Sequence, residues 1–325
     1  MSRFFSPRSQ LTAAAAIVEA RLPRPSMTFY DPSSDHCSGS MHFMLLDRDK
    51  VLATDQTGRA SVYHAGLHAL RTAPTLTRPK HRPVSVAVGD SSLYVLDSTS
   101  RTPGGPKEEH CFEALVYERG RLYNDVFWEH DWCCHSLPTP PYRPSAIHAY
   151  TVFGGSDLWV STEDEGTYSF DTARGAWANQ GHWKLPFRGL AHYVPEYKLW
   201  FGLSRSNSKG RHNLFCAFDL ATAAKRQSTP VPRNAWKDLW PPKEWMPDTS
   251  FLVHLGSARF CIARFFGNYR RDHPCQMDAD AEHETLAVFT AVEVQPCGKT
   301  GKGLQMIKYK SECYNLGGGI DQWVL

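Results

Sequence analysis

The chain has 325 residues, of which 42% are hydrophobic, so it can bury a large core as two domains or as one repeat architecture. Its 36 basic and 33 acidic residues leave a net charge of +3, which is too small to indicate binding to nucleic acid or to an anionic membrane surface. No segment approaches the roughly 18 consecutive apolar residues of a membrane helix, so we expect a soluble protein.

Aromatic residues and turn-forming residues are both frequent. Aromatic side chains make up 12% of the chain, and there are 23 glycines and 22 prolines. This composition is typical of many short strands separated by turns. We therefore expect an all-β protein.

The cysteines and the first residues bear on the compartment. The chain has nine cysteines without a regular pairing pattern, and it has no Asn-x-Ser/Thr acceptor site for glycans. Both features favour reduced thiols in a cytoplasmic or nuclear protein. Residues 1–24 contain Arg3, Arg8, four successive alanines and one acid, Glu19, so an organellar transit peptide is the alternative to a short helix before the first strand.

The predicted strands recur in five units with one order of parts: a leading strand a, strands b and c, and a strand d before a Pro-rich connector. In chain order the units cover 41–77, 84–137, 147–188, 190–231 with its strand d at 226–231, and 251–309. An aromatic residue closes strand c at Tyr63, Tyr117, Phe170, Phe218 and Phe289, and a proline follows strand d at Pro79, Pro138, Pro186 and Pro241. Both markers recur about every 50 residues, which is the spacing of a four-stranded kelch-type propeller blade.

The clearest unit carries a resemblance to a known family. Its Gly154-Gly155 pair, Tyr168 and Trp177 resemble a degenerate kelch repeat. In this unit we expect Gly154-Gly155 to make the a–b turn, Phe170 to face the core, and Trp159 and Trp177 to pack between blades. The run 150–201 and the stretches around Leu252 and Ala287 resemble a plant family, expanded in grasses, of uncharacterised kelch-like, F-box-associated-type proteins with a domain of unknown function. The resemblance implies a β-propeller and no established activity.

The resemblance also sets the expected domain organisation. We expect five complete four-stranded blades with a partial sixth blade at the termini, because members of that family carry further strands before the segment that corresponds to residues 4–7. The predicted divisions are an N-terminal segment at 1–30, the propeller at 31–316 and a tail at 317–325.

Three segments invite a chemical interpretation, and each has a simpler one. The cysteines and histidines of 130–135 suggest zinc, but adjacent Cys133 and Cys134 on a strand point to opposite faces. The acids between Asp278 and Glu284 lack the spacing of a calcium loop, and 298–303 cannot be written as a phosphate loop. We expect no enzyme activity, no metal and no cofactor.

The long insertions predict a binding face. They fall in the b–c loops 97–111, 205–213 and 267–284, and in a meander these loops share one face with the d–a crossovers, including 236–245. Arginine and tryptophan are over-represented in interaction hot spots, although these tryptophans can also pack between blades. The residues expected on this face are Arg101, Lys107, Arg205, Lys209, Arg211, Trp240, Trp245, Arg270 and Arg271.

The sequence therefore predicts a non-enzymatic scaffold that binds a protein partner through this face. The partner's identity is open, and the resemblance suggests a ubiquitin-ligase-type substrate receptor that lacks its own F-box. We expect a monomer that binds neither nucleic acid nor membranes. The alternative is a propeller that binds a small ligand, or acts as an enzyme, through its central channel.

Overall fold

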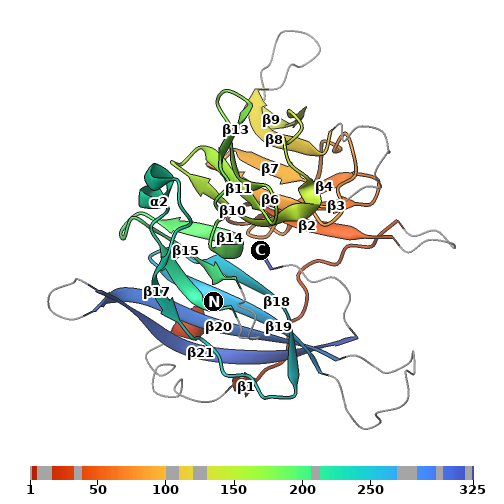
Figure 1. Ribbon diagram of the computed structural model, residues 1–325. Coiled ribbons are helices and arrows are strands. Elements are labelled where there is room, and N and C mark those ends of the chain that lie inside the picture. The colour runs from red at the N-terminus through yellow and green to blue at the C-terminus, as the bar shows by residue number, and fades with distance from the viewer. Residues whose placement is uncertain are drawn as a thin grey trace, which may run out of the picture. The chain divides into compact units, whose positions relative to one another are not determined.

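Figure 1 shows the structure, a computed structural model that describes residues 2–5, 17–32, 39–99, 110–119, 130–205, 213–268, 284–297, 303–318 and 324–325. Its regular elements are almost all strands, so the predicted all-β class is confirmed. The chain divides into two compact units: residues 24–185 with 325, and residues 1–23 with 186–324. The boundaries at 30 and 316 that the sequence predicts stay a prediction.

The 24–185 unit contains three antiparallel groups of four strands, and hydrogen-bonded neighbours within each group follow one another in the chain. The first group is β2 (Met41–Asp47), β3 (Lys50–Asp55), β4 (Ala60–His64) and β5 (Ala69–Ala73). The second is β6 (Val84–Val88), β7 (Ser92–Leu96), β8 (Phe112–Arg119) and β9 (His130–Ser136). After the 3-10 turn η2 (Pro144–Ala146), the third is β10 (Ile147–Phe153), β11 (Asp157–Thr162), β12 (Gly166–Asp171) and β13 (Ala176–Gly181).

The third group shows why the sequence forms these strands. β11 and β12 read as apolar runs broken by small hydroxyl residues, and they are almost completely buried. The turn between β10 and β11 contains Gly154 and Gly155 at φ values of 64° and 84°, a region that glycine enters without the steric cost that a side chain adds. The predicted a–b turn is therefore confirmed.

The apolar faces of neighbouring groups share cores. Leu52 of β3 packs in one cluster with Leu93 and Leu115 of the next group. Phe112 of β8 and Phe170 of β12 lie 4.9 Å apart, centroid to centroid, in a second cluster. Trp177 also belongs to this cluster, and its indole N–H donates to the carbonyl oxygen of Pro138 at 3.0 Å. Phe170 therefore faces the core, and Trp177 lies between sheets, as the sequence predicts.

Trp159 has two aromatic partners within its own repeat, and its packing between blades stays a prediction. Its ring stacks on Phe153 at 4.3 Å and contacts Trp183 at 5.7 Å, and both partners belong to the same repeat. Because Phe153 ends the neighbouring strand β10, Trp159 finds an aromatic partner beside it in its own sheet. Only 4% of its surface is exposed.

The 186–324 unit contains two further groups of four strands. The first is β14 (Phe187–Val194), β15 (Leu199–Ser204), β16 (Phe215–Phe218) and β17 (Pro232–Trp236), with the helix α2 (Leu220–Arg226) between β16 and β17. The second is β18 (Trp245–His254), β19 (Arg259–Asn268), β20 (Glu284–Cys297) and β21 (Gly303–Gly318). Phe201, Phe215 and Phe260 form the centre of the core that the two groups share.

The predicted strand d at 226–231 is wrong. Arg226 ends α2, and the fourth strand of this group begins only at Pro232. The helix begins because the Asp219 carboxylate accepts a hydrogen bond from the Thr222 backbone N–H at 3.0 Å, and the alanines that follow favour the helix. It ends at Gln227, which has a left-handed φ of 48°.

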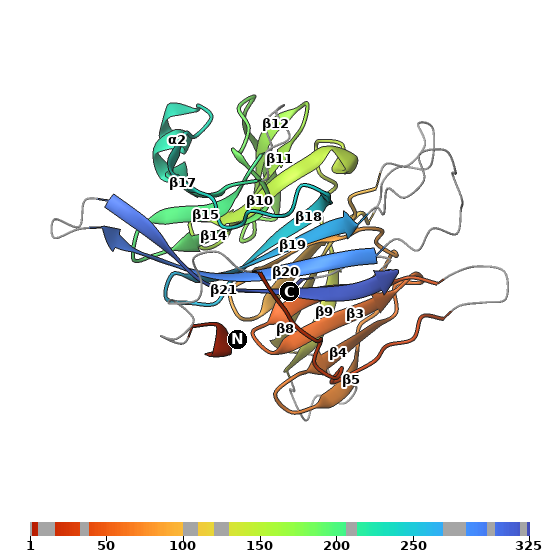
Figure 2. The same cartoon turned by 90° about the horizontal axis from the view of Figure 1, so that it is seen from below.

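The first residues belong to the second sheet of this unit, whose strands β18 to β21 Figure 2 shows side by side. The strand β1 (Ile17–Glu19) pairs in parallel with β21 from Ser311 to Cys313 and extends the sheet to five strands. The 3-10 turn η1 (Ser2–Phe5) packs on the same sheet through Phe4. Two expectations stay predictions: that the termini form a separate partial blade, and that the five groups close into a ring.

In the parts of the chain that the structure describes, no helix has the length and apolar character needed to cross a membrane.

Candidate functional site: the connection between β17 and β18

Most of the predicted binding residues lie outside the described part of the chain. These are Arg101, Lys107, Lys209, Arg211, Arg270 and Arg271. The structure does describe Arg205, Trp240 and Trp245. Arg205 follows β15 directly, its side chain is exposed, and its backbone N–H donates to the carbonyl oxygen of Pro186 at 3.3 Å.

The connection between β17 and β18, residues 237–244, is fixed at both ends by aromatic contacts. Trp236 packs on Phe215 of β16 with the ring centroids 5.6 Å apart. Trp245 packs on Phe266 of β19 at 5.3 Å. Between them, Leu239 is 2% exposed and enters the core cluster around Phe266. Trp245 therefore packs within its own sheet, and the alternative that these tryptophans pack between blades stays a prediction.

A buried ion pair holds the middle of the same connection. Asp238 is 2% exposed, and Arg264 of β19 is 3% exposed. The Arg264 Nε donates to Asp238 Oδ2 at 2.9 Å, and its Nη2 donates to Oδ1 at 2.6 Å. This parallel two-bond geometry is the strongest form of arginine–carboxylate pair, and it fixes the orientation of the connection as well as its position.

Arg264 also joins two other segments to the pair. Its Nη2 donates to the carbonyl oxygen of Asn213, the last residue of the 205–213 insertion, at 2.5 Å. Its Nη1 donates to the Ser250 hydroxyl of β18 at 3.3 Å. One side chain thus ties the β17–β18 connection, the end of the β15–β16 connection and β18 to β19.

The remaining large side chain of the connection faces solvent. Trp240 is 75% exposed, and the Lys237 ammonium lies over its ring at 3.0 Å from the centroid. A cation over an indole face is attracted by the ring quadrupole, and at an exposed site this contributes about 0.5–1 kcal/mol. The connection therefore presents an indole and an ammonium group together on an anchored backbone.

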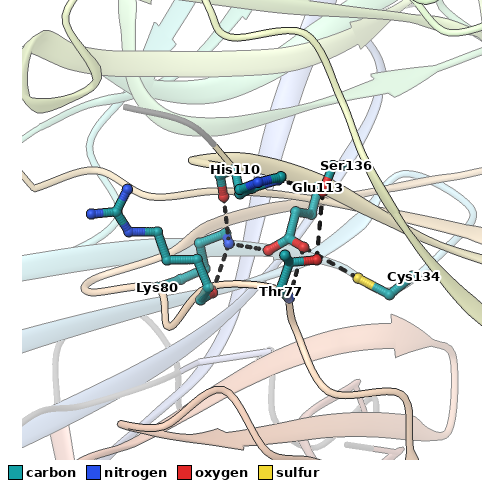
Figure 3. Close-up of polar contacts among 7 residues, drawn as sticks. Thr77, Lys80, His110, Glu113, Cys134 and Ser136 are labelled. Carbon is teal, nitrogen blue, oxygen red and sulfur yellow. Dashed lines mark hydrogen bonds and ion pairs between the residues drawn. The ribbon is translucent and has the colours of Figure 1, made fainter. Parts of the chain in front are cut away.

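A second buried polar cluster lies in the 24–185 unit and ties the β5–β6 connection to β8. Figure 3 shows Lys80 and Glu113 at its centre. Lys80 is fully buried, and its ammonium donates to the Glu113 carboxylate and, at 2.8 Å each, to the carbonyl oxygens of Arg78 and His110. The other Glu113 oxygen accepts from the Thr77 backbone N–H at 2.9 Å and from the Cys134 thiol at 3.4 Å.

The chemistry of this cluster indicates a structural role. Burial alone would raise the pKa of Glu113, but the hydrogen bonds from Lys80 and Thr77 and the Lys80 charge lower it below its usual value. Burial and the Glu113 carboxylate raise the pKa of Cys134 to about 11, so the thiol is not poised as a nucleophile. All three protons of Lys80 have acceptors, so the cluster binds chain segments to one another.

The zinc interpretation of 130–135 can be compared with the side-chain placement. Cys134 belongs to the buried cluster, whereas burial and the nearby Glu118 raise the pKa of Cys133. His135 Nε2 lies 2.8 Å from Glu118 on the exposed side of β9. The adjacent thiols thus have different partners, because successive residues of a strand point to opposite faces.

Two histidines of the 186–324 unit are half-buried without forming a catalytic arrangement. His192 Nε2 lies 3.0 Å from the carbonyl oxygen of Leu252 and therefore carries the proton. Its ring is 5.9 Å from that of His254, which stacks on Phe260 at 4.9 Å. Burial lowers the pKa of His192 to about 4, and it also lowers the pKa of His254, an effect that Glu196 partly opposes.

We predict that His192 makes this unit sensitive to acid. In the unfolded chain His192 binds a proton below its ordinary pKa of about 6.5, whereas in the folded chain it does so only below about pH 4. The free energy of unfolding therefore falls as the pH is lowered from about 6.5 to about 4. Between pH 7.5 and 5 the loss is about 2 kcal/mol. Urea unfolding at both pH values should show a smaller loss in His192→Gln, whose amide can still donate to Leu252. An equal loss in both proteins would exclude His192 as the cause.

Sequence reasoning missed Lys237, Asp238, Arg264, Lys80 and Glu113. For Arg264 and Glu113 a signal existed, because each is a lone charge inside an apolar strand, and such residues are almost always paired. For Asp238 and Lys80 there was none, because each lies in a connection of ordinary polar composition.

The fold and site define a class: an all-β protein of consecutive four-stranded antiparallel groups, with an anchored connection that presents an exposed tryptophan. The family model described as "Protein of unknown function (DUF1668)" matches residues 2–314, and the chain belongs to this family. No curated protein matches the chain.

Two similar solved structures come from Bacteroides thetaiotaomicron. One is a structural genomics protein of unknown function, with a TM-score of 0.38 and 10% identity over 68% of this chain and 52% of that one. The other is the extracellular domain assigned to a hybrid two-component system, with a TM-score of 0.38 and 11% identity over 86% of this chain and 34% of that one. The chain thus spans about half and about a third of their lengths, and these scores carry no argument about function.

Proposed function

We propose that the chain is a non-enzymatic interaction module that binds a partner protein through the surface around Trp240. The observation that carries this proposal is an indole that is 75% exposed on a connection held by a buried ion pair and two flanking tryptophans. An exposed indole keeps a large apolar surface in contact with water, which is unfavourable. Tryptophan is also enriched in interface hot spots. The fixed backbone lowers the ordering cost of binding.

The wider setting of this surface is part of the proposal. In this proposal the five consecutive four-stranded groups are the blades of a kelch-like propeller. Support comes from the strand order within each group. Arg264 also joins the end of the β15–β16 insertion, at Asn213, to Asp238 of the connection that carries Trp240. By analogy with F-box-associated propellers of plants, the role would be that of a substrate receptor in a ubiquitin ligase whose F-box is supplied by a partner.

The test compares two exposed aromatic residues. Trp240→Ala should weaken partner binding by about 30-fold or more, because truncating a hot-spot tryptophan costs about 2 kcal/mol or more. Tyr30→Ala is the matched control, since Tyr30 is 88% exposed and lies in the other unit. Partners identified by affinity purification are then produced pure, and their dissociation constants are measured with all three proteins. Equal affinities for the Trp240→Ala variant and the wild type would refute the proposal and favour the central-channel alternative.

A further inference from the structure

The Ser2–Phe5 turn occupies an aromatic surface on β20 and β21. Phe4 is 5% exposed and packs against Ala291 of β20 and Tyr309 of β21, with Phe289 and Ile307 beside them. The turn, marked N in Figure 2, lies against β21. A phenylalanine ring buried to this degree by a four-residue turn indicates a receiving surface that fits it.

The second aromatic residue of the turn has its own contacts. The Phe5 ring lies 5.0 Å from that of Tyr309, and the Arg259 guanidinium carbon lies 5.3 Å from the Phe5 centroid. Glu293 holds both receiving side chains, because its carboxylate accepts from the Tyr309 hydroxyl at 2.6 Å and pairs with Arg259 at 3.7 Å. Tyr309 and Arg259 are therefore held by contacts that do not involve the turn.

This surface is distinct from the Trp240 site. Ala291 contacts Phe4, whereas Val288 of the same strand packs with Leu239 of the β17–β18 connection. Successive residues of a strand alternate between faces, and β20 pairs with β19 without a register shift, so these two residues face opposite sides of the sheet.

The turn is attached to the sheet by a short covalent path. Residues 6–16 separate it from β1, whose three residues pair with β21. A tether of this length gives an effective concentration of about millimolar, so the turn can remain docked with a weak intrinsic affinity. An occupant held in this way exchanges with a ligand of the same chemistry that binds more tightly.

We propose that the surface formed by Arg259, Ala291, Glu293 and Tyr309 is a peptide-binding groove for two adjacent aromatic residues, and that Phe4-Phe5 occupies it in cis. The ligand that would displace Phe4-Phe5 from this surface is a segment of a partner protein that contains two adjacent aromatic residues. A second copy of this chain fits the groove equally well, but it offers the same weak motif and would have to compete with the millimolar cis segment. The groove would be open to the partner only when the partner's segment outcompetes the turn.

The experiment uses the full chain and a fluorescent peptide of residues 2–8, Ser-Arg-Phe-Phe-Ser-Pro-Arg. The Phe4→Ala/Phe5→Ala variant should vacate the groove and bind this peptide at least tenfold more tightly than the wild type does, measured by fluorescence anisotropy. Adding Tyr309→Ala or Arg259→Ala to that variant should weaken binding again. A peptide with both phenylalanines replaced by alanine is the control probe, and circular dichroism checks that each protein is folded.

Three outcomes would overturn the proposal. The first is that the Phe4→Ala/Phe5→Ala variant does not bind the peptide, and the second is that it binds the peptide no more tightly than the wild type does. The third is that the wild type dimerises at micromolar concentration through exchange of this turn, as measured by light scattering, because the groove would then serve a second copy of the chain.

If the double variant does not fold, Phe5→Ala alone takes its place under the same criteria.

Discussion

Replacing Arg264 with methionine is expected to lower the free energy of unfolding of the 186–324 unit by about 3–5 kcal/mol. Methionine keeps much of the buried volume, but Asp238 would remain almost fully buried without its two hydrogen bonds from the guanidinium. The carbonyl oxygen of Asn213 would also lose its donor. Removing one partner of a buried pair leaves an uncompensated charge, and this cost exceeds the net worth of the intact pair.

A double-mutant cycle separates this explanation from a simple packing defect. Asp238→Leu should cost less in the Arg264→Met background than in the wild type by more than about 2 kcal/mol, since the charge that needed a partner is gone. Chemical unfolding of the four proteins gives the coupling directly. If the two substitutions add, the pair does not fix the connection, and the support that Arg264 lends to the Trp240 surface is lost with it.

Strand-length apolar segments between turn residues were enough to predict most of the strands. β10 to β13 lie where the pattern of 147–188 places them, and β11 and β12 read as short apolar runs because both of their faces are buried. The pattern failed at 226–231. There the local capping by Asp219 and the helix-forming alanines decide the structure, while the apolar marker, a lone Val231, is 79% exposed.

The candidate site could be predicted only in part. Trp236, Trp240 and Trp245 are equivalent as sequence signals, yet the first and last pack on phenylalanines while Trp240 faces solvent. What separates them is the Asp238–Arg264 pair, whose members are 26 residues apart and meet only because β19 passes under the connection. The sequence predicts such a loop to be functional, but only the tertiary fold decides which of its side chains remains exposed.

The same distinction applies to the Lys80 cluster. Glu113 stands inside the apolar strand β8, which indicates a buried partner, but the partner could be any of the basic residues nearby in the fold. Lys80 is selected because the β5–β6 connection carries Thr77 and Lys80 to the two oxygens of one carboxylate. A connection can be held in this way without any sequence motif.

Replacing Lys80 with methionine is expected to destabilise the 24–185 unit by about 3–5 kcal/mol at pH 7. Glu113 would stay fully buried and would keep only the Thr77 and Cys134 donors. In the wild type the lowered pKa of Glu113 stabilises the fold at pH values above the pKa that this group has in the unfolded chain. This stabilisation is lost as the pH falls through the pKa of Glu113 in the folded chain. In the variant, burial without the Lys80 ammonium raises the pKa of Glu113. Lowering the pH then protonates the carboxyl group and removes the cost of burying its charge.

The predicted result is therefore a stability difference between wild type and Lys80→Met that narrows as the pH is lowered from 7 to 5. The matched control is Lys80→Met/Glu113→Gln, in which the amide oxygen still accepts from the Thr77 N–H but no buried charge remains. It should regain most of the lost stability at pH 7 and show no such pH dependence, as measured by urea unfolding. A Lys80→Met difference that is constant with pH, or a double variant no more stable than the single one, would mean that the buried charge of Glu113 does not govern this connection.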